Sequence, residues 1–227
     1  MVARIYLIRH GETHENKQHI IQGQLDTDLN ETGFEQARSV RDRLQDVPLC
    51  AAFSSDSKRA ADTARTILER HPGVQLQTFE ALRERYMGEL QGKRGNLYGV
   101  LPPSVEQPGH FRARLLKWWF EVLVPYIATT VEQDQETLEE PHAHIIITSH
   151  GASISFLLLA LLNEKQYARG PGEDYSSSHK RIYNASISTI DVRTDGSGVL
   201  VKVGDASHLE KPALERNADV VQDEPNA

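Results

Sequence analysis

Histidine follows an apolar run at two places in this sequence, and each time glycine comes next. Residues 5–8 are followed by Arg9-His10-Gly11, and residues 144–148 lead through one serine to His150-Gly151. A run of β-branched and aromatic residues predicts a buried strand, and the glycine permits a sharp turn where it ends. In open α/β sheets, ligands bind at the carboxyl ends of the strands. Two reactive imidazoles are therefore expected at equivalent places on one ligand-binding edge.

Five motifs in a fixed order resemble the histidine phosphatase superfamily, the phosphoglycerate-mutase-like proteins. They extend along nearly the whole chain. The motifs are Arg9-His10-Gly11-Glu12-Thr13 with Asn16, Gln22-Gly23 before Asp28-Leu29 and Thr32-Gly33, Ser54-Ser55-Asp56 with Arg59-Ala60 and Thr63-Ala64, Leu82-Arg83-Glu84-Arg85-Tyr86-Met87-Gly88, and His150-Gly151. The resemblance implies phosphoryl transfer through a phosphohistidine, with no metal and no other cofactor. Residues 82–88 and 204–209 look most like broad-range phosphatases and fructose-2,6-bisphosphatase-type members of the family.

The resemblance implies that His10 is the nucleophile. Attack on phosphorus needs a lone pair, so the imidazole must be neutral, and adjacent guanidinium charges favour that state because like charges repel. The alternative interpretation is a structural histidine at a strand end, which is the commoner case for a lone histidine. The arginine before it, the glycine after it and the second His-Gly favour the catalytic interpretation.

Arg9 and Arg59 are implied to clamp the phosphate. A guanidinium fork matches two phosphate oxygens and stays charged at any working pH. His150 would donate a hydrogen bond to a phosphoryl oxygen in the transition state. The other substrate-binding positions that the resemblance implies are Asn16, Gln22, Gly23 and the backbone N–H of Gly151. The alternative for either arginine is a solvated helix face, which we expect for Lys58.

Glu84 is the implied proton donor for the leaving group. It stands between Arg83 and Arg85, and two flanking arginines would lower the pKa of its carboxyl. Acid function therefore needs burial, or the negative charge of the substrate, to raise that pKa. Glu80 and Glu89 are close enough in the sequence to be rivals. A surface glutamate paired with a neighbouring arginine is the alternative interpretation.

Composition limits the kinds of partner. The 227 residues carry a net charge of -7 with a pI near 5.8, which disfavours a nucleic-acid surface built of clustered Lys and Arg. Cys50 is the only cysteine, so no internal disulfide can form. No segment approaches the roughly 18 apolar residues of a membrane span.

We expect a cytoplasmic protein, with the nucleus as a further compartment. It should bind a small phosphorylated substrate, neither nucleic acid nor membrane, as a monomer or homodimer.

Hydrophobic periodicity predicts alternating strands and helices. Strands are expected at about residues 4–9, 51–54, 76–79, 144–148, 186–192 and 199–204. Helices are expected at about 31–46, 57–71, 111–127 and 151–163. This alternation favours a three-layer α/β/α sandwich with a mostly parallel central sheet. Residues 195–198, Asp-Gly-Ser-Gly, predict a hairpin that places an antiparallel pair of strands at one edge.

A single domain over residues 1–208 is expected, followed by a polar tail at 209–227 that is predicted to be disordered. Residues 88–109, 129–142 and 165–184 give no assignable pattern. His142 and His144 have a spacing that could hold a metal from one strand face, but no further ligand follows, so no metal site is predicted. Trp118 and Trp119 are expected to pack in the core.

The central motifs do not separate a phosphatase from a mutase, because both form a phosphohistidine. Mutases of the family resemble one another in a longer insertion with paired arginines after the acid, whereas this chain has only Lys93-Arg94 before Leu101-Pro102-Pro103. The expected function is therefore hydrolysis of phosphomonoesters on small phosphorylated metabolites. The alternatives, in order, are a sugar-bisphosphatase of narrow specificity, a phosphoglycerate mutase and a catalytically idle interaction domain.

Overall fold

The computed structural model of the protein describes residues 2–95, 101–131, 143–164, 166–173, 175 and 182–209. Within them, seven strands form one sheet in the order β3-β2-β4-β1-β6-β7-β5. The strands are β1 Val2–Arg9, β2 Leu49–Ser55, β3 Leu76–Phe79, β4 Ala143–Ser149, β5 Tyr167–Arg169, β6 Ile187–Arg193 and β7 Gly198–Asp205. Apart from Leu209, the predicted disordered tail lies outside the described residues.

Strand β1 lies inside the sheet, where it pairs parallel to β4 and antiparallel to β6. Among the described strands only β6 runs against the others, because β7 returns along it and β5 is parallel to β7. The carboxyl ends of β1, β2 and β4 therefore meet at one edge, together with the residues that precede β6. The mostly parallel sheet is confirmed. The antiparallel pair β6 and β7 was expected at the edge of the sheet. It lies one strand inside that edge, because β5 pairs with the outer side of β7.

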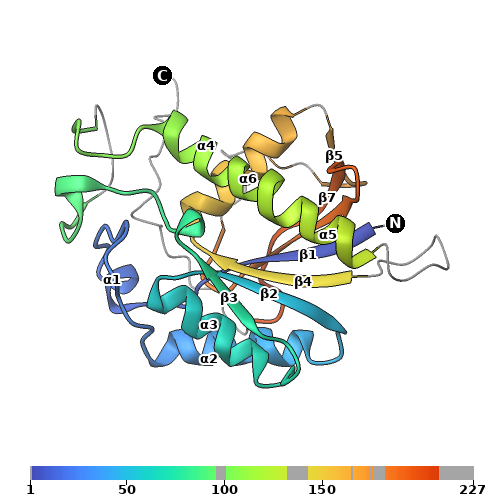
Figure 1. Ribbon diagram of the computed structural model, residues 1–227. Coiled ribbons are helices and arrows are strands. Elements are labelled where there is room, and N and C mark those ends of the chain that lie inside the picture. The colour runs from blue at the N-terminus through green and yellow to red at the C-terminus, as the bar shows by residue number, and fades with distance from the viewer. Residues whose placement is uncertain are drawn as a thin grey trace.

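Helices cover both faces of the sheet, which gives the expected three layers (Figure 1). On one face lie α2 (Glu31–Leu44) and α3 (Lys58–Leu68), and on the other lie α4 (Pro108–Trp118), α5 (Val124–Val131) and α6 (Gly151–Asn163). The short helix α1 (His14–Lys17) lies beyond the carboxyl end of β1. None of the described helices is both long and apolar enough to span a membrane.

The helix expected over residues 111–127 is longer and interrupted. It begins at Pro108, and proline suits the first position of a helix. Trp119–Leu123 then forms a π-helical turn, η3, before α5 continues to Val131. Trp118 and Trp119 are buried as expected, and Nε1 of Trp119 donates to the Tyr167 hydroxyl at 2.8 Å. This bond ties the interrupted helix to the edge strand β5, which the sequence analysis did not assign.

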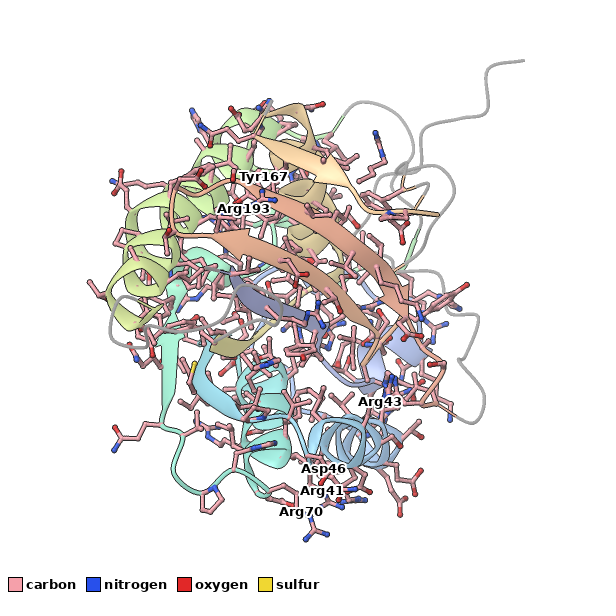
Figure 2. The ribbon with its side chains drawn as sticks, turned by 90° about the vertical axis from the view of Figure 1, so that its right-hand side faces the viewer. Arg41, Arg43, Asp46, Arg70, Tyr167 and Arg193 are labelled. Carbon is pink, nitrogen blue, oxygen red and sulfur yellow. The ribbon has the colours of Figure 1, made fainter. Side chains whose placement is uncertain are left out.

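Helix α2 follows the predicted pattern closely. Asn30 caps it, with its Oδ1 atom accepting from the N–H of Gly33 at 2.8 Å. Its buried face includes Ala37, Val40 and Leu44. On the outer side, Arg41 reaches Glu69 beyond the end of α3 at 2.7 Å, in the part of the molecule shown at the bottom of Figure 2. This ion pair joins the two helices that cover the same face.

Helix α3 begins at Lys58, one residue after its expected start. Arg59 therefore lies in the first turn of the helix. The helix ends at Leu68, short of the expected end at His71, whose N–H closes a turn on the Leu68 carbonyl at 2.8 Å. The start of the helix at Lys58 places Arg59 next to the carboxyl edge of the sheet.

The loop after β1 is in direct backbone contact with the start of α2. A Cβ atom on Gly33 would lie 2.1 Å from the carbonyl oxygen of Glu12. A Cβ atom on Gly11 would lie 2.4 Å from the carbonyl oxygen of Gly33. Both positions therefore need glycine, and α2 supports the loop that carries the first histidine motif.

We expect Gly33→Ala to lower the free energy of unfolding by about 1–3 kcal/mol, the usual cost of forcing extra volume into a packed site. Urea denaturation measures the change. Gly109→Ala is the matched control, because Gly109 also lies in the first turn of a helix and a Cβ there meets nothing within 4 Å. It should leave stability unchanged or raise it by up to about 1 kcal/mol. Equal losses in both variants would contradict the proposed contact.

Candidate active site

The two strand-end histidines lie next to each other. His10 follows β1 and His150 follows β4, and these neighbouring strands are in register, with Arg9 opposite Ser149. The ring centroids are 5.2 Å apart, with the ring planes at 61°. His10 is 3% exposed and His150 is 0% exposed. Parallel pairing of two strands that are distant in the sequence therefore builds one buried pair of imidazoles.

Two hydrogen bonds determine the tautomer of His10. Its Nδ1 atom lies 2.7 Å from the carbonyl oxygen of Gly11, and a carbonyl can only accept, so Nδ1 carries the proton. Its Nε2 atom accepts from Nε of Arg59 at 3.3 Å, and a guanidinium can only donate. The ring is therefore a neutral imidazole that presents a lone pair at Nε2.

The pKa values of His10 and His150 are lowered well below the ordinary 6.5. Burial is the largest cause for both, because desolvation disfavours the imidazolium form. The positive charge of Arg59 is the next cause, and that of Arg9 lowers both pKa values further. Both rings are therefore neutral at neutral pH, as nucleophilic attack by a histidine requires.

Two buried guanidinium groups flank the rings. Arg59 donates through Nη2 to the carbonyl of Gly23 at 2.8 Å and through Nη1 to that of Leu25 at 2.6 Å. Arg9 donates through Nη1 to the carbonyl of Ile182 at 2.9 Å. A buried charge is costly unless it is hydrogen-bonded, and here backbone carbonyls of separate loops supply the partners. Neither arginine lies on a solvated helix face.

Glu84 is 1% exposed, and its carboxylate lies at the start of α6, directly after His150. Its Oε2 atom accepts from the N–H of Ala152 at 2.9 Å. Its Oε1 atom accepts from the N–H groups of Ser153 at 3.1 Å and Arg85 at 2.8 Å. A helix N-terminus favours negative charge, so α6 holds this carboxylate beside the second histidine.

The interpretation of Glu84 as an exposed ion-pair residue is wrong. Arg83, which could have paired with it, donates through Nε to Asp56 at 2.7 Å. The two rival carboxylates are exposed: Glu80 lies 3.5 Å from Arg83, and Glu89 accepts from the hydroxyl of Ser104 at 3.2 Å. Of the three carboxylates considered, only Glu84 is buried beside the histidines.

The other predicted substrate-binding positions also come to this edge. Oδ1 of Asn16 accepts from the N–H of Thr13 at 3.1 Å, which orients its amide nitrogen as a donor. Oε1 of Gln22 accepts from the Thr13 hydroxyl at 3.1 Å, and the carbonyl of Gly23 accepts from the guanidinium of Arg59. Gly151 is the first residue of α6. The predicted positions therefore form one connected group around the rings.

Two polar side chains that the sequence analysis did not single out also belong to the site. Oγ of Ser55 lies 2.9 Å from Nε2 of His150, and Nδ2 of Asn184 donates to the carbonyl of His10 at 3.0 Å. Ser55 is the last residue of β2. An apolar run that ends on polar residues, the pattern that indicated the two histidines, could therefore have indicated it as well. Asn184 precedes β6, and only the reversed direction of that strand brings it to this edge.

His144, one of the two histidines whose spacing could hold a metal, lies away from the ligand-binding edge of the sheet. His142 lies outside the described residues, and Nδ1 of His144 lies 3.1 Å from the Tyr6 hydroxyl near the start of β4, at the opposite end of the strand from His150. Among the described residues, no group of three or more His, Cys, Asp or Glu side chains is arranged to hold a metal ion.

A family model of the histidine phosphatase superfamily (branch 1) matches residues 5–205. The chain belongs to this superfamily. It is 34% identical over 215 residues to a probable phosphatase of Schizosaccharomyces pombe, covering 91% of this chain and 95% of that one. A metal-independent phosphoserine phosphatase of Arabidopsis thaliana is 30% identical over 232 residues, covering 96% and 88%. A probable phosphoglycerate mutase of Yersinia pestis is 30% identical over 226 residues, covering 94% and 98%.

A solved structure supports the same assignment. Mycobacterial glucosyl-3-phosphoglycerate phosphatase matches with a TM-score of 0.65 and 25% identity, covering 87% of this chain and 95% of that one. The resemblance to the histidine phosphatase superfamily, which we inferred from the five motifs, is confirmed. Superfamily membership and the named phosphatases among the relatives support a phosphomonoester hydrolase that works without a metal.

Acid should destabilise this fold through its two buried histidines. The unfolded chain binds a proton on each imidazole below its ordinary pKa of about 6.5, whereas the folded protein binds it only below the lowered pKa. The stability that these groups contribute is therefore complete above about pH 6.5 and is lost as the pH falls. Between the two pKa values, the free energy of unfolding should fall by up to about 1.4 kcal/mol per pH unit for each histidine.

Urea denaturation of the wild type, His10→Gln and His150→Gln over the range from neutral to mildly acidic pH measures this effect. Each variant lacks one of the buried imidazoles and keeps every other titrating group. Each should therefore lose less stability than the wild type over the same pH range. Identical slopes for all three proteins would show that the imidazoles are not neutral in the folded state.

Proposed function

We propose that the protein hydrolyses small phosphomonoesters by transferring the phosphoryl group first to Nε2 of His10 and then to water. The observation that carries this proposal is the tautomer of His10. Its Nδ1 atom is hydrogen-bonded to the Gly11 carbonyl, and the lone pair of its Nε2 atom faces Nε of Arg59. A neutral imidazole with an oriented lone pair is the nucleophile that attack on phosphorus requires.

Arg9 and Arg59 bind the non-bridging oxygens in this proposal. Their guanidinium groups are already held by carbonyls, so they need little reorganisation when a phosphate enters. Nε2 of His150 is bound to Ser55, and its buried Nδ1 has no hydrogen-bond partner among the residues that the structure describes. We assign Nδ1 as the donor to a phosphoryl oxygen, with the Ser55 hydroxyl donating to Nε2. Asn16 adds its amide nitrogen as a further donor.

Glu84 moves the proton in both steps. In the first, the bond from Nε2 of His10 to phosphorus forms, the bond to the leaving oxygen breaks, and Glu84 protonates that oxygen. In the second, water attacks phosphorus, the bond to Nε2 breaks, and Glu84 takes a proton from the water. The negative charge of an incoming phosphate favours protonation of Glu84, so binding of the substrate prepares the acid.

We favour hydrolysis over a mutase reaction, although the relatives include a mutase as well as phosphatases. The segment after the acid offers Lys93 and Arg94 as its adjacent cations, and both are exposed. Retention of a bisphosphate between two half-reactions calls for stronger cationic binding than two exposed side chains provide. Small phosphorylated metabolites are therefore the proposed substrates, and phosphoglycerate mutase activity is the second candidate.

We further propose that the protein works in the cytoplasm, without a nucleic-acid or membrane partner. The free, exposed thiol of Cys50 suits a reducing compartment. The net charge of -7 disfavours binding to polyanions, so an anionic substrate must be held by the local charges of the site.

His10→Ala should lower the turnover of p-nitrophenyl phosphate by at least about 10⁴-fold, because the group that bonds to phosphorus is gone. Rapid quench of the wild type with labelled substrate should trap an acid-labile, base-stable adduct, and the variant should trap none. His110→Ala, which removes an exposed histidine from α4, is the control and should keep both turnover and adduct. A wild-type enzyme that turns over without a labelled intermediate would refute the covalent mechanism.

Glu84→Gln should lower the rate with an alkyl phosphate by roughly 10²- to 10⁴-fold, the usual range for general acid catalysis. The loss should shrink with p-nitrophenyl phosphate, whose leaving group hardly needs a proton. Affinity for vanadate should change little, because Glu84 does not belong to the phosphate clamp. Equal losses with the two substrates would indicate that Glu84 has a structural role and is not the acid.

A further inference from the structure

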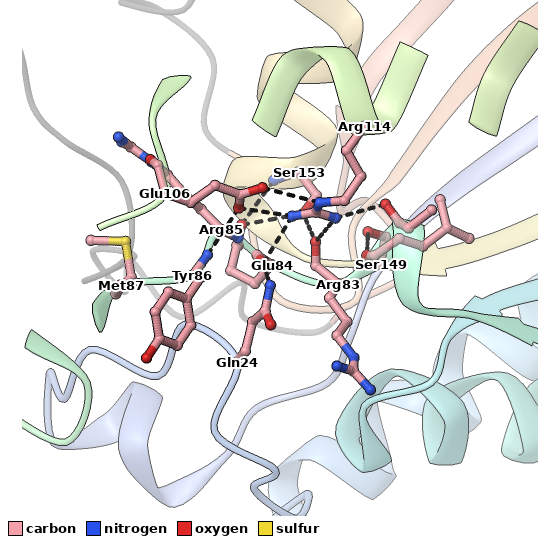
Figure 3. A network of polar contacts seen from close by, with 12 residues as sticks. Gln24, Arg83, Glu84, Arg85, Tyr86, Met87, Glu106, Arg114, Ser149 and Ser153 are labelled. Carbon is pink, nitrogen blue, oxygen red and sulfur yellow. Dashed lines mark hydrogen bonds and ion pairs between the residues drawn. The ribbon is translucent and has the colours of Figure 1, made fainter. Parts of the chain in front are cut away.

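The segment that carries Glu84 depends on side chains from other elements for its backbone hydrogen bonds. The four consecutive carbonyls from Ala81 to Glu84 all accept from side chains. Figure 3 shows the four donor residues, Arg114, Ser149, Ser153 and Gln24, around this segment. The Ser149 hydroxyl donates to the carbonyl of Leu82 at 2.8 Å, and the Ser153 hydroxyl donates to that of Arg83 at 3.0 Å. The side-chain amide of Gln24 donates to the carbonyl of Glu84 at 3.0 Å. The backbone that carries the acid is therefore held by a cage of side chains, while the start of α6 holds its carboxylate.

Arg114, on α4, makes the largest contribution to this cage. Its Nη1 atom donates to the carbonyls of Ala81 at 2.7 Å and Arg83 at 3.0 Å, and its Nη2 atom donates to that of Glu84 at 3.4 Å. One side chain thus binds three of the four carbonyls. The rigid fork of a guanidinium suits this task, since it fixes several donors in one plane.

Glu106 completes the arrangement from the other side. Its carboxylate accepts from Nε of Arg114 at 3.1 Å and from Nη2 at 2.9 Å, a bidentate pair that fixes the plane of the guanidinium. The same residue holds the chain that follows the acid: its carbonyl accepts from Nε of Arg85 at 2.7 Å, and its N–H donates to the carbonyl of Tyr86 at 2.8 Å. Figure 3 shows these contacts as one connected network around Glu84.

We propose that Arg114 and Glu106 form a positioning pair that holds Glu84 at the distance from which it can protonate the leaving group. This inference rests on the proposed role of Glu84 as the acid. The pair acts through the backbone of residues 81–86 and does not contact the reacting atoms. Displacement of a catalytic group by about 1 Å can cost about 10²-fold in rate, so the accuracy of this support matters for catalysis.

Arg114→Met removes the guanidinium and keeps a side chain of similar reach. We expect kcat with an alkyl phosphate to fall by about 10- to 100-fold, because the acid is misplaced. With p-nitrophenyl phosphate kcat should stay close to wild type, as should the affinity for vanadate. Arg112→Met is the matched control, since Arg112 lies on the same helix, is exposed and pairs with Glu164 at 3.3 Å. It should change neither rate.

Equal losses with both substrates, in step with a lower melting temperature, would show that the pair only stabilises the fold and would overturn the inference. So would unchanged kcat with the alkyl phosphate. Should Arg114→Met fail to fold, Glu106→Gln replaces it. That variant keeps the shape of the network while weakening the pair, and the same selective loss on the alkyl phosphate is expected.

The double variant Glu84→Gln/Arg114→Met separates this inference from the proposed function. If Arg114 acts through Glu84, its substitution should add almost no further loss in the Glu84→Gln background. A full additional loss there would overturn the inference. Equal losses of Glu84→Gln itself on both substrates would instead refute the role of Glu84 as the acid. A selective loss in Glu84→Gln without one in Arg114→Met would refute only the positioning role.

Discussion

Two guanidinium groups are buried against two imidazoles, and the surrounding structure makes this combination stable. Burial, and then the permanent charges of Arg59 and Arg9, lower the pKa values of the histidines and keep them neutral. Backbone carbonyls must face the buried guanidinium groups, because these stay charged at any working pH. The chain near Gly23 and Ile182 supplies those carbonyls. The site is thus a fixed group of positive charges with a neutral imidazole, His10, among them. An anionic phosphate is the ligand that balances this charge.

Much of this arrangement could be predicted from the sequence. Apolar runs that end on polar residues identified the carboxyl ends of β1 and β4, and with them His10 and His150. The same pattern at β2 would have indicated Ser55. The helices α2 and α6 were also predictable. One stripe of α2 is buried and its cap is a side chain with a known preference, whereas α6 is apolar along most of its length and is mostly buried.

Other parts could not be predicted, for physical reasons. The carbonyl of Ile182 that binds Arg9 is a backbone group and has no signature in the sequence. Asn184 reaches the site only because β6 runs antiparallel to its neighbours. The three-residue strand β5 depends on long-range pairing with β7 and on the bond from Trp119 to Tyr167, so its local pattern is too short to indicate a strand. Arg114 resembles any basic residue on a helix, and its proposed role depends on three carbonyls from another segment.

The position of the Glu84 carboxylate and the tautomer of His10 both follow from backbone geometry. Three N–H groups hold the carboxylate of Glu84 next to His150, and the Gly11 carbonyl holds the proton of His10 on Nδ1. The central claim is that this carbonyl, together with Arg59, selects Nε2 as the atom that attacks phosphorus. The most direct test is to hydrolyse the trapped phosphoenzyme in base and to compare the released phosphohistidine by chromatography with standards of the Nδ1 and Nε2 isomers. The account predicts the isomer phosphorylated on Nε2. Phosphorus on Nδ1, or on a residue other than His10, would contradict it.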